Sequence, residues 1–257
     1  MKEIVVCDRA NHKEVSLLCK KYGVSVNIDT FSNTETYDIY PEEVNKNLSR
    51  YLEVKIASIH GPYKDLCLGS SDKLIKSATM ARFEYTYQIS RLLGCPNIIL
   101  HHGYIPGTSY PSSWVKRAKS FFYEFLYNKN HNINIHIENQ FERTPDLLSE
   151  VVYTVNDSRL KICLDVGHAN CNSKTSVIDW IEQLNDKISF VHLHNNNGLT
   201  DQHLDFTNGT INFKEICFAL EKHAPNCIWG IETNNLDDTE KSIQWLIDNH
   251  YLQGNNK

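Results

Sequence analysis

The sequence contains no long hydrophobic stretch. Its apolar runs fall far short of the roughly 18 residues that a membrane-spanning helix needs, and the first run, Ile4 to Cys7, is too short for the core of a signal peptide. A secreted or membrane-embedded protein is therefore not expected. The sequence predicts a cytoplasmic protein without a membrane partner.

Cysteine pairing patterns are also missing. The eight cysteines form no CxxC pair, and their spacing is irregular. Several lie inside apolar runs, such as Cys163 in KICLDVG, where small buried thiols are common. These features predict reduced, structural cysteines and favour that interpretation over a zinc site made of thiolates.

Basic residues are not in excess. The 26 Lys and Arg residues are outnumbered by 31 Asp and Glu residues, which gives a net charge of −5, and they are spread evenly along the chain. Proteins that bind duplex nucleic acid usually show a basic patch or stripe. The composition therefore argues against a large nucleic-acid surface, while a local patch within the acidic total stays open. No feature indicates a protein partner.

Short apolar runs rich in β-branched residues alternate with longer helical patterns along the whole chain. This alternation predicts a parallel sheet with right-handed crossovers, and eight units predict an α/β fold with a single closed (β/α)8 TIM barrel. Open nucleotide-binding sheets usually carry a glycine-rich turn after the first strand, and CDRANH is not such a turn. No linker or low-complexity segment divides the chain, so we expect one TIM-barrel domain over residues 1–257. The predicted strands are 3–8, 25–31, 54–60, 97–102, 132–139, 161–166, 188–194 and 227–233, and the predicted helices are 12–21, one opening near 41, 72–93, 112–127, 145–155, 176–184, 213–223 and 239–250.

Histidine and acidic residues gather where the predicted strands end. In a TIM barrel, the carboxyl ends of the strands form the face that holds the active site. Imidazoles mixed with carboxylates are ligands that zinc or manganese bind in proteins. The strand ends therefore predict a metalloenzyme with ligands for more than one divalent ion. The residues at these positions are His60, His101, His102, His168, His192, His194 and His203, together with Glu138, Asp165, Asp201 and Glu232.

Local spacing predicts which side chains face this site. The adjacent His101 and His102 point to opposite sides of a strand, so only one of them is expected to face inward. Glu138 follows an apolar strand, where a buried carboxylate needs a compensating charge. A salt bridge would supply that charge, but a metal or catalytic role is the favoured interpretation. The other histidines fall in helices, loops or the middle of a strand and are predicted to be structural: His12, His131, His136, His223 and His250.

Seven motifs at these strand ends occur in the order HGPY, LHHG, IEN, LDVGHA, VHLHNNNG, DQHLDFTNGTINF and IETN. Together they resemble the xylose-isomerase-like barrel superfamily, which includes endonuclease IV-type apurinic/apyrimidinic endonucleases and many sugar isomerases and epimerases. The resemblance covers essentially the whole chain. It implies the same TIM-barrel fold.

The resemblance to endonuclease IV-type enzymes also implies a ligand set. Those enzymes hold three zinc-type ions with nine side chains, and this chain looks able to supply all nine, with manganese as an alternative metal. The three ligand groups are His60 and His101 with Glu138 as a bridge; Glu138 with Asp165, His192 and Glu232; and His168 with Asp201 and His203. The resemblance to the epimerase branch implies only the second of these groups, around a single metal. The surplus ligands therefore favour the endonuclease-like interpretation.

The loops depart from the endonuclease pattern. His102 stands where the endonuclease has proline, and only eight residues separate His192 from Asp201, whereas that family uses extended loops to bend DNA. Tyr63 lies where the family has a DNA-penetrating tyrosine, but the following KDLCLGSSDKLI lacks basic character. A smaller sugar phosphate therefore stays open as an alternative substrate to abasic DNA.

Three functions are compatible with these residues, and phosphoester hydrolysis is the favoured hypothesis. A metal-activated hydroxide would attack phosphorus, Glu138 would help to position it, and a third ion near His168 would stabilise the leaving oxygen. The alternative is a sugar or sugar-phosphate isomerase or epimerase, in which one metal holds the substrate while Glu138 and Glu232 exchange a proton with carbon. A barrel that binds metal and ligand without turnover is the third possibility. The predicted catalytic residues are Glu138, Glu232 and His168, and the predicted substrate contacts are Tyr63, His102, Asn139 and His194.

Overall fold

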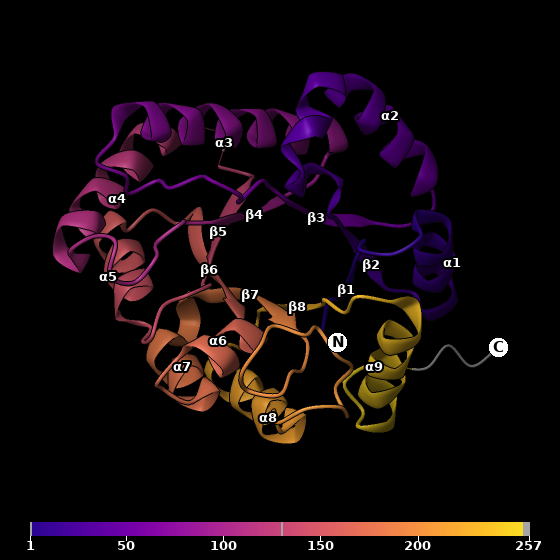
Figure 1. Cartoon of the computed structure of the whole chain (residues 1–257). Helices are drawn as coiled ribbons and strands as arrows, with labels where there is room; N and C mark the ends of the chain where they lie inside the picture. Colours follow the sequence, from indigo (N-terminus) through magenta and orange to yellow (C-terminus); the bar gives the residue numbers. More distant parts are fainter. Residues whose placement is uncertain (1, 130, 254–257) are drawn as a thin grey trace.

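The computed structural model describes residues 2–129 and 131–253. Over these residues, eight parallel strands close into a barrel in chain order, with β1 pairing to both β2 and β8, and the helices lie around the outside (Figure 1). The predicted TIM barrel is confirmed. The strands are β1 (Ile4–Cys7), β2 (Ser25–Ile28), β3 (Ile56–His60), β4 (Asn97–His101), β5 (Asn134–Glu138), β6 (Leu160–Asp165), β7 (Ile188–Leu193) and β8 (Ile228–Ile231).

The connections between strands carry the helices that the sequence predicts, with one addition. The short helix α6 begins directly where β6 ends, and Asp165 is its N-cap because its carboxylate accepts a hydrogen bond from the backbone N–H of His168. Three short 3₁₀ segments, η1 (Thr30–Ser32), η2 (Thr34–Ile39) and η3 (Asn185–Lys187), complete the order. The α-helices are α1 (His12–Tyr22), α2 (Tyr40–Arg50), α3 (Lys73–Leu93), α4 (Pro111–Leu126), α5 (Asp146–Val155), α6 (Val166–Asn172), α7 (Val177–Leu184), α8 (Phe213–His223) and α9 (Leu236–Asp248).

Two predicted helix starts were wrong, and local chemistry explains both. The helix predicted over 112–127 begins one residue earlier, with Pro111 in its first turn, where the fixed proline φ suits a helix start. The helix expected from 239 begins instead at Leu236, because the side chain of Asn235 accepts a hydrogen bond from the backbone N–H of Asp238.

Apolar side chains fill two separate regions. A small cluster lies inside the barrel and contains Phe190 and Cys163, while a much larger one lies between the strands and the surrounding helices. In the larger cluster Phe121 is fully buried, and its ring lies 5.5 Å from Phe83 and 6.2 Å from Phe125, as expected for a helix stripe that faces the core. All eight cysteines are free. Across the described residues, no helix combines the length and apolar character needed to cross a bilayer.

Replacing Phe121 with alanine should lower the free energy of unfolding by about 3–5 kcal/mol, because the cavity left in a close-packed cluster cannot be refilled. Urea titration followed by circular dichroism measures this loss. Phe218, which is 68% exposed, provides the control, and Phe218→Ala should change stability by less than about 0.5 kcal/mol. Equal losses in the two variants would contradict the packing assigned to Phe121.

Candidate metal centre

The predicted ligands stand side by side because strand register places them there. His60, His101, Glu138 and Asp165 are the last residues of β3, β4, β5 and β6. His101 pairs with Glu138 and Asp165 pairs with His192 across neighbouring strands. Parallel strands in register bring equivalent positions to one rim, so residues distant in sequence meet at the same end of the barrel.

Glu138 lies at the centre of this rim. Its Oε2 is 3.3 Å from His60 Nε2 and 3.2 Å from His101 Nε2, and its Oε1 is 3.2 Å from His192 Nδ1 and 3.5 Å from His168 Nδ1. Burial alone would raise the pKa of the Glu138 carboxyl, but the charges of His101 and His192 outweigh it and hold that pKa well below its usual value. Glu138 is therefore ionised, with a separate set of imidazoles at each oxygen.

A second group of side chains converges on His192. Its Nδ1 lies 3.2 Å from Glu138 Oε1, 3.3 Å from Glu232 Oε2 and 3.7 Å from Asp165 Oδ2. Burial would raise the pKa of Glu232, yet the charges of His192, Arg9 and His203 lower it overall. Three carboxylates from three strands thus surround one imidazole nitrogen, as expected for the middle ligand group.

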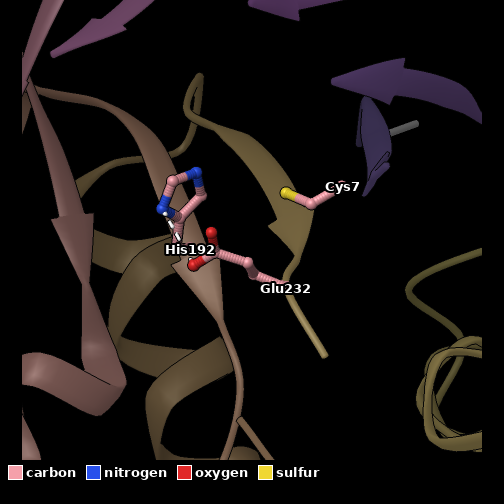
Figure 2. A group of neighbouring side chains, drawn as sticks. All are labelled: Cys7, His192 and Glu232. Atoms are coloured by element: carbon pink, nitrogen blue, oxygen red, sulfur yellow. Dashed lines mark ion pairs between the residues drawn. The ribbon is translucent and has the colours of Figure 1, made fainter. Parts of the chain in front are cut away.

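The thiol of Cys7 adjoins this second group. Figure 2 shows Cys7 on β1, the strand next to β8, with its sulfur directed toward His192 and Glu232, and the three could together contact one ion. Burial, however, raises the pKa of the Cys7 thiol to about 12. Since a thiol must lose its proton to bind a metal, the carboxylates are the better ligands at neutral pH.

The third predicted group also comes together. Asp201 Oδ2 lies 2.9 Å from His203 Nε2 and 3.3 Å from His168 Nε2. His203 has a φ of 51°, a left-handed backbone conformation that costs a non-glycine residue about 1–3 kcal/mol. Such strain is typically retained where it serves a site.

Histidine hydrogen bonds show that the site fits a divalent metal. His60, His168 and His203 each place Nδ1 at 2.8–2.9 Å from a backbone carbonyl oxygen, of Gly61, Asn139 and Glu232 respectively. Donation from Nδ1–H to those carbonyls fixes the tautomer and leaves Nε2 of each ring as a lone-pair donor toward the site. Burial would lower the pKa of both His168 and His192. Asp165, Asp201 and Glu138 nevertheless raise the pKa of His168 well above its usual value, and Cys163, Glu232 and Glu138 do the same for the pKa of His192. A divalent ion would take the place of protons held between these groups.

His194 and Asn139, predicted to contact substrate, instead lie behind the ligands. His194 is fully buried, with Nε2 3.0 Å from both carboxylate oxygens of Asp165, and its ring stacks on His203 at 3.8 Å. The side chain of Asn139 donates to the backbone carbonyl of Asp165 and accepts from its N–H. Both residues therefore orient Asp165 and its neighbours.

His102 points away from the site, as the alternation along β4 predicts for one member of the pair. It is buried against Glu142, with which it forms a hydrogen-bonded ion pair, and the Trp114 ring packs edge-on against it at 5.3 Å. Glu142 also accepts a hydrogen bond from the backbone N–H of Gln140. We therefore reassign His102 from substrate contact to the framework that joins the loops after β4 and β5.

A cavity of about 110 Å³ opens above the ligands. It is smaller than the roughly 300–1,000 Å³ typical of sites for drug-sized molecules, and it suits a compact polar ligand. Tyr63 lines it as predicted, and its ring stacks on His101 at 4.8 Å. Four lining residues were not predicted: Arg9, Asp29, Ser32 and Gln140.

One of these residues had a signal in the sequence. Arg9 lies just after the first strand, so the strand-end rule applied to that strand would have found it, whereas Asp29 directly follows β2 but fell inside the longer strand predicted over 25–31. Arg9 Nη1 is 3.2 Å from Glu232 Oε1 and 3.0 Å from His203 Nδ1. Burial raises the pKa of Asp29 above its usual value, in part against the opposing charges of His60 and Arg9.

The fold and the site define a (β/α)8 barrel whose rim carries groups of side chains that could hold metal ions. Residues 16–249 match the family model of the xylose isomerase-like TIM barrel, so the chain belongs to that family. This confirms the predicted superfamily.

Similar proteins include both uncharacterised and named members. An uncharacterized protein of Methanocaldococcus jannaschii is 28% identical over 204 residues, which cover 76% of this chain and 69% of that protein. A D-tagatose 3-epimerase-like protein of known structure is 25% identical, with a TM-score of 0.76 over 98% of this chain and 97% of that one. The IOLI protein with a bound zinc atom shares the fold at 18% identity, with a TM-score of 0.75 over 96% and 94% of the chains. Several further solved structures with this fold are sugar 3-epimerases.

His194→Ala should weaken zinc binding by about 10–100-fold although His194 is not itself a predicted ligand, because Asp165 would lose the partner of both its oxygens. Competition against a chromophoric chelator measures the affinity. His131→Ala, which removes an exposed histidine away from the rim, is the matched control and should leave the affinity unchanged. Unchanged affinity in His194→Ala would show that Asp165 needs no such support.

Proposed function

We propose that the protein is a divalent-metal-dependent sugar isomerase or epimerase that moves a proton at the carbon next to a carbonyl group. The observation that carries this proposal is the convergence of Glu138 and Glu232, from β5 and β8, on Nδ1 of His192. The D-tagatose 3-epimerase-like relative, which aligns along almost the whole chain, supports the same reaction class. This replaces phosphoester hydrolysis, which the sequence alone favoured.

The two glutamates have matching environments. Each directs one oxygen toward His192 and has its other oxygen next to a different partner: His60 and His101 for Glu138, and Arg9 for Glu232. The pKa of each carboxyl is lowered by its charged neighbours against the effect of burial. Both glutamates are therefore ionised and able to accept a proton from carbon.

The reaction balances with these two groups. One glutamate takes the proton from the carbon next to the carbonyl, and the C–H electron pair forms the enediol double bond as the carbonyl electrons move to oxygen. The other glutamate, which has to take up a proton from solvent before this step, returns that proton to the opposite face of the same carbon in an epimerase or to the neighbouring carbon in an isomerase, while the electrons on oxygen re-form the carbonyl group. When bound by Glu138, Asp165, His192 and Glu232, a divalent metal would supply Lewis-acid polarisation of the carbonyl.

The charge of the site supports an uncharged substrate if one ion is bound. The carboxylates of Asp29, Glu138, Asp165, Asp201 and Glu232 with the guanidinium of Arg9 leave four negative charges when all are ionised. One divalent ion reduces this to two negative charges, which repel a phosphate group. Two ions would make the sum neutral, and three would make the same site positive and attract phosphate. The number of bound ions therefore sets which substrate class the cavity accepts.

Glu138→Gln and Glu232→Gln should each lower proton exchange by roughly 10²–10⁴-fold, because each removes one proton acceptor. The measurement is loss of the substrate C–H signal in proton NMR, with metal-loaded protein and unphosphorylated ketohexoses in D₂O. Exchange at C3 indicates an epimerase and exchange at C1 an isomerase. Exposed Glu150 provides the matched control, and Glu150→Gln should exchange at the wild-type rate. No exchange with any sugar in the fully loaded wild-type protein would sink the proposal.

Phosphoester hydrolysis is the second candidate, and one observation favours it. A one-metal isomerase has no need for the third group, yet Asp201, His168 and a strained His203 converge there. In this case three equivalents of zinc should bind, and His203→Ala should lose about one equivalent together with hydrolysis of bis(4-nitrophenyl) phosphate and of abasic-site oligonucleotides. Elemental analysis and the two assays measure this. Under the isomerase proposal, His203→Ala keeps most of its sugar proton exchange.

A further inference from the structure

We propose that Arg9 and Asp29 form a hydroxyl-recognition subsite, which we call the β1–β2 subsite, and that it selects unphosphorylated sugars. The inference rests on the proposed isomerase or epimerase function and assigns the substrate class of that same site. Both residues line the cavity above the predicted metal ligands, on the side formed by β1 and β2, between β8 and β3.

Strand register places the two residues together. Cys7 of β1 pairs with Asn27 of β2, and Arg9 and Asp29 lie two residues after Cys7 and Asn27, respectively. The backbone N–H of Asp8 donates to the carbonyl of Asn27, so the chain that leaves β1 is still hydrogen-bonded to β2 at this point. The subsite is thus held by the barrel itself.

Arg9 keeps free donors. Its Nη1 forms a salt bridge with Glu232 Oε1, while Nε and Nη2 have no hydrogen-bond partner among the described residues. Its side chain is 28% exposed, and no other Lys or Arg of the described chain lines this cavity. Arg9 is therefore anchored at one nitrogen and can still donate to a ligand.

Asp29 keeps free acceptor capacity. Within the described chain, its carboxylate has one side-chain hydrogen bond, a long one of 3.4 Å between Ser32 Oγ and Oδ2. Arg9 and Asp29 form no ion pair within 4.0 Å, since the salt bridge of Arg9 goes to Glu232. A cationic donor and an anionic acceptor therefore face the same small cavity without neutralising each other.

Hydroxyl groups match this pair, and a phosphate does not. A hydroxyl both donates and accepts, so neighbouring hydroxyls of a sugar can accept from Arg9 and donate to Asp29. A phosphate dianion has acceptors only, so it would satisfy Arg9 but offer no donor to the carboxyl oxygens of Asp29. Asp29 thus acts against phosphorylated competitors, as a repulsive element does in other selective sites.

The test compares binding of D-fructose and D-fructose 6-phosphate to metal-loaded protein by ligand-observed NMR, with inorganic phosphate as a third probe. Wild-type protein should prefer D-fructose. The isosteric Asp29→Asn should weaken D-fructose binding by about tenfold and tighten D-fructose 6-phosphate binding, so that the preference shrinks or reverses. Arg9→Gln should weaken both, and Arg9→Lys, which keeps the charge, should recover part of the loss. Asp186→Asn, the same change at an exposed site before β7, should leave both affinities unchanged.

Three results would overturn the subsite. In the first, wild-type protein prefers the phosphorylated sugar, and this preference is lost in Arg9→Gln but unchanged in Asp29→Asn. The second is a preference for D-fructose that is the same in wild type and Asp29→Asn. The third is no binding of D-fructose or of any other unphosphorylated hexose. Failure of the proposed reaction can be distinguished from failure of the subsite. If an unphosphorylated sugar binds selectively but exchanges no proton with solvent, the subsite is retained and only the isomerase or epimerase activity is ruled out.

Discussion

Glu138 is an ionised carboxylate that is 1% exposed, so its charge has to be balanced by the side chains around it. Removing such a charge from water is costly unless partners replace the solvent. Here the partners are imidazoles from β3, β4, β6–α6 and β7, which contact it from both oxygens. Their own positions follow from strand register, since His101 stands directly beside Glu138 in the sheet. The strand register that closes the barrel therefore also brings the polar side chains of the rim together.

Several of the predicted ligands at the rim are held by a second contact. Asp165 accepts from the backbone N–H of His168 and lies between His194 and Asn139, so one residue caps α6, ends β6 and faces His192. Gly167 is required for this packing, because a Cβ there would lie 1.9 Å from the His194 ring. Orientation by such neighbours is what tunes ligand basicity and metal affinity in metalloproteins. The motif LDVGHA encodes this unit in six consecutive residues.

Much of this architecture could be predicted from local patterns, and the failures have physical causes. Eight apolar runs with intervening helices define the barrel, and alternation along β4 separates His101 from His102 without knowledge of the fold. The partner of His102, Glu142, lies forty residues away in sequence and cannot be inferred from spacing. Helix α6 is too short for a periodic pattern and overlaps the ligand motif. Arg9 was missed because the strand-end rule was applied to clusters of histidine and acid rather than to every strand, and Asp29 was missed because the second strand was predicted to run on to residue 31. The preferred reaction changed because ligand residues alone do not report that Glu138 and Glu232 converge on one nitrogen of His192.

Glu138 belongs to two ligand groups at once, with Oε2 toward His60 and His101 and Oε1 toward His192. Ions at these two groups could not bind as independent events. The first ion would orient the shared carboxylate and withdraw part of its negative charge, and the second would meet a ligand that is better ordered but less basic. Thermodynamic linkage makes this influence equal in both directions. Titration of the protein with metal would thus show positive or negative cooperativity, and its source would be the shared carboxylate of Glu138.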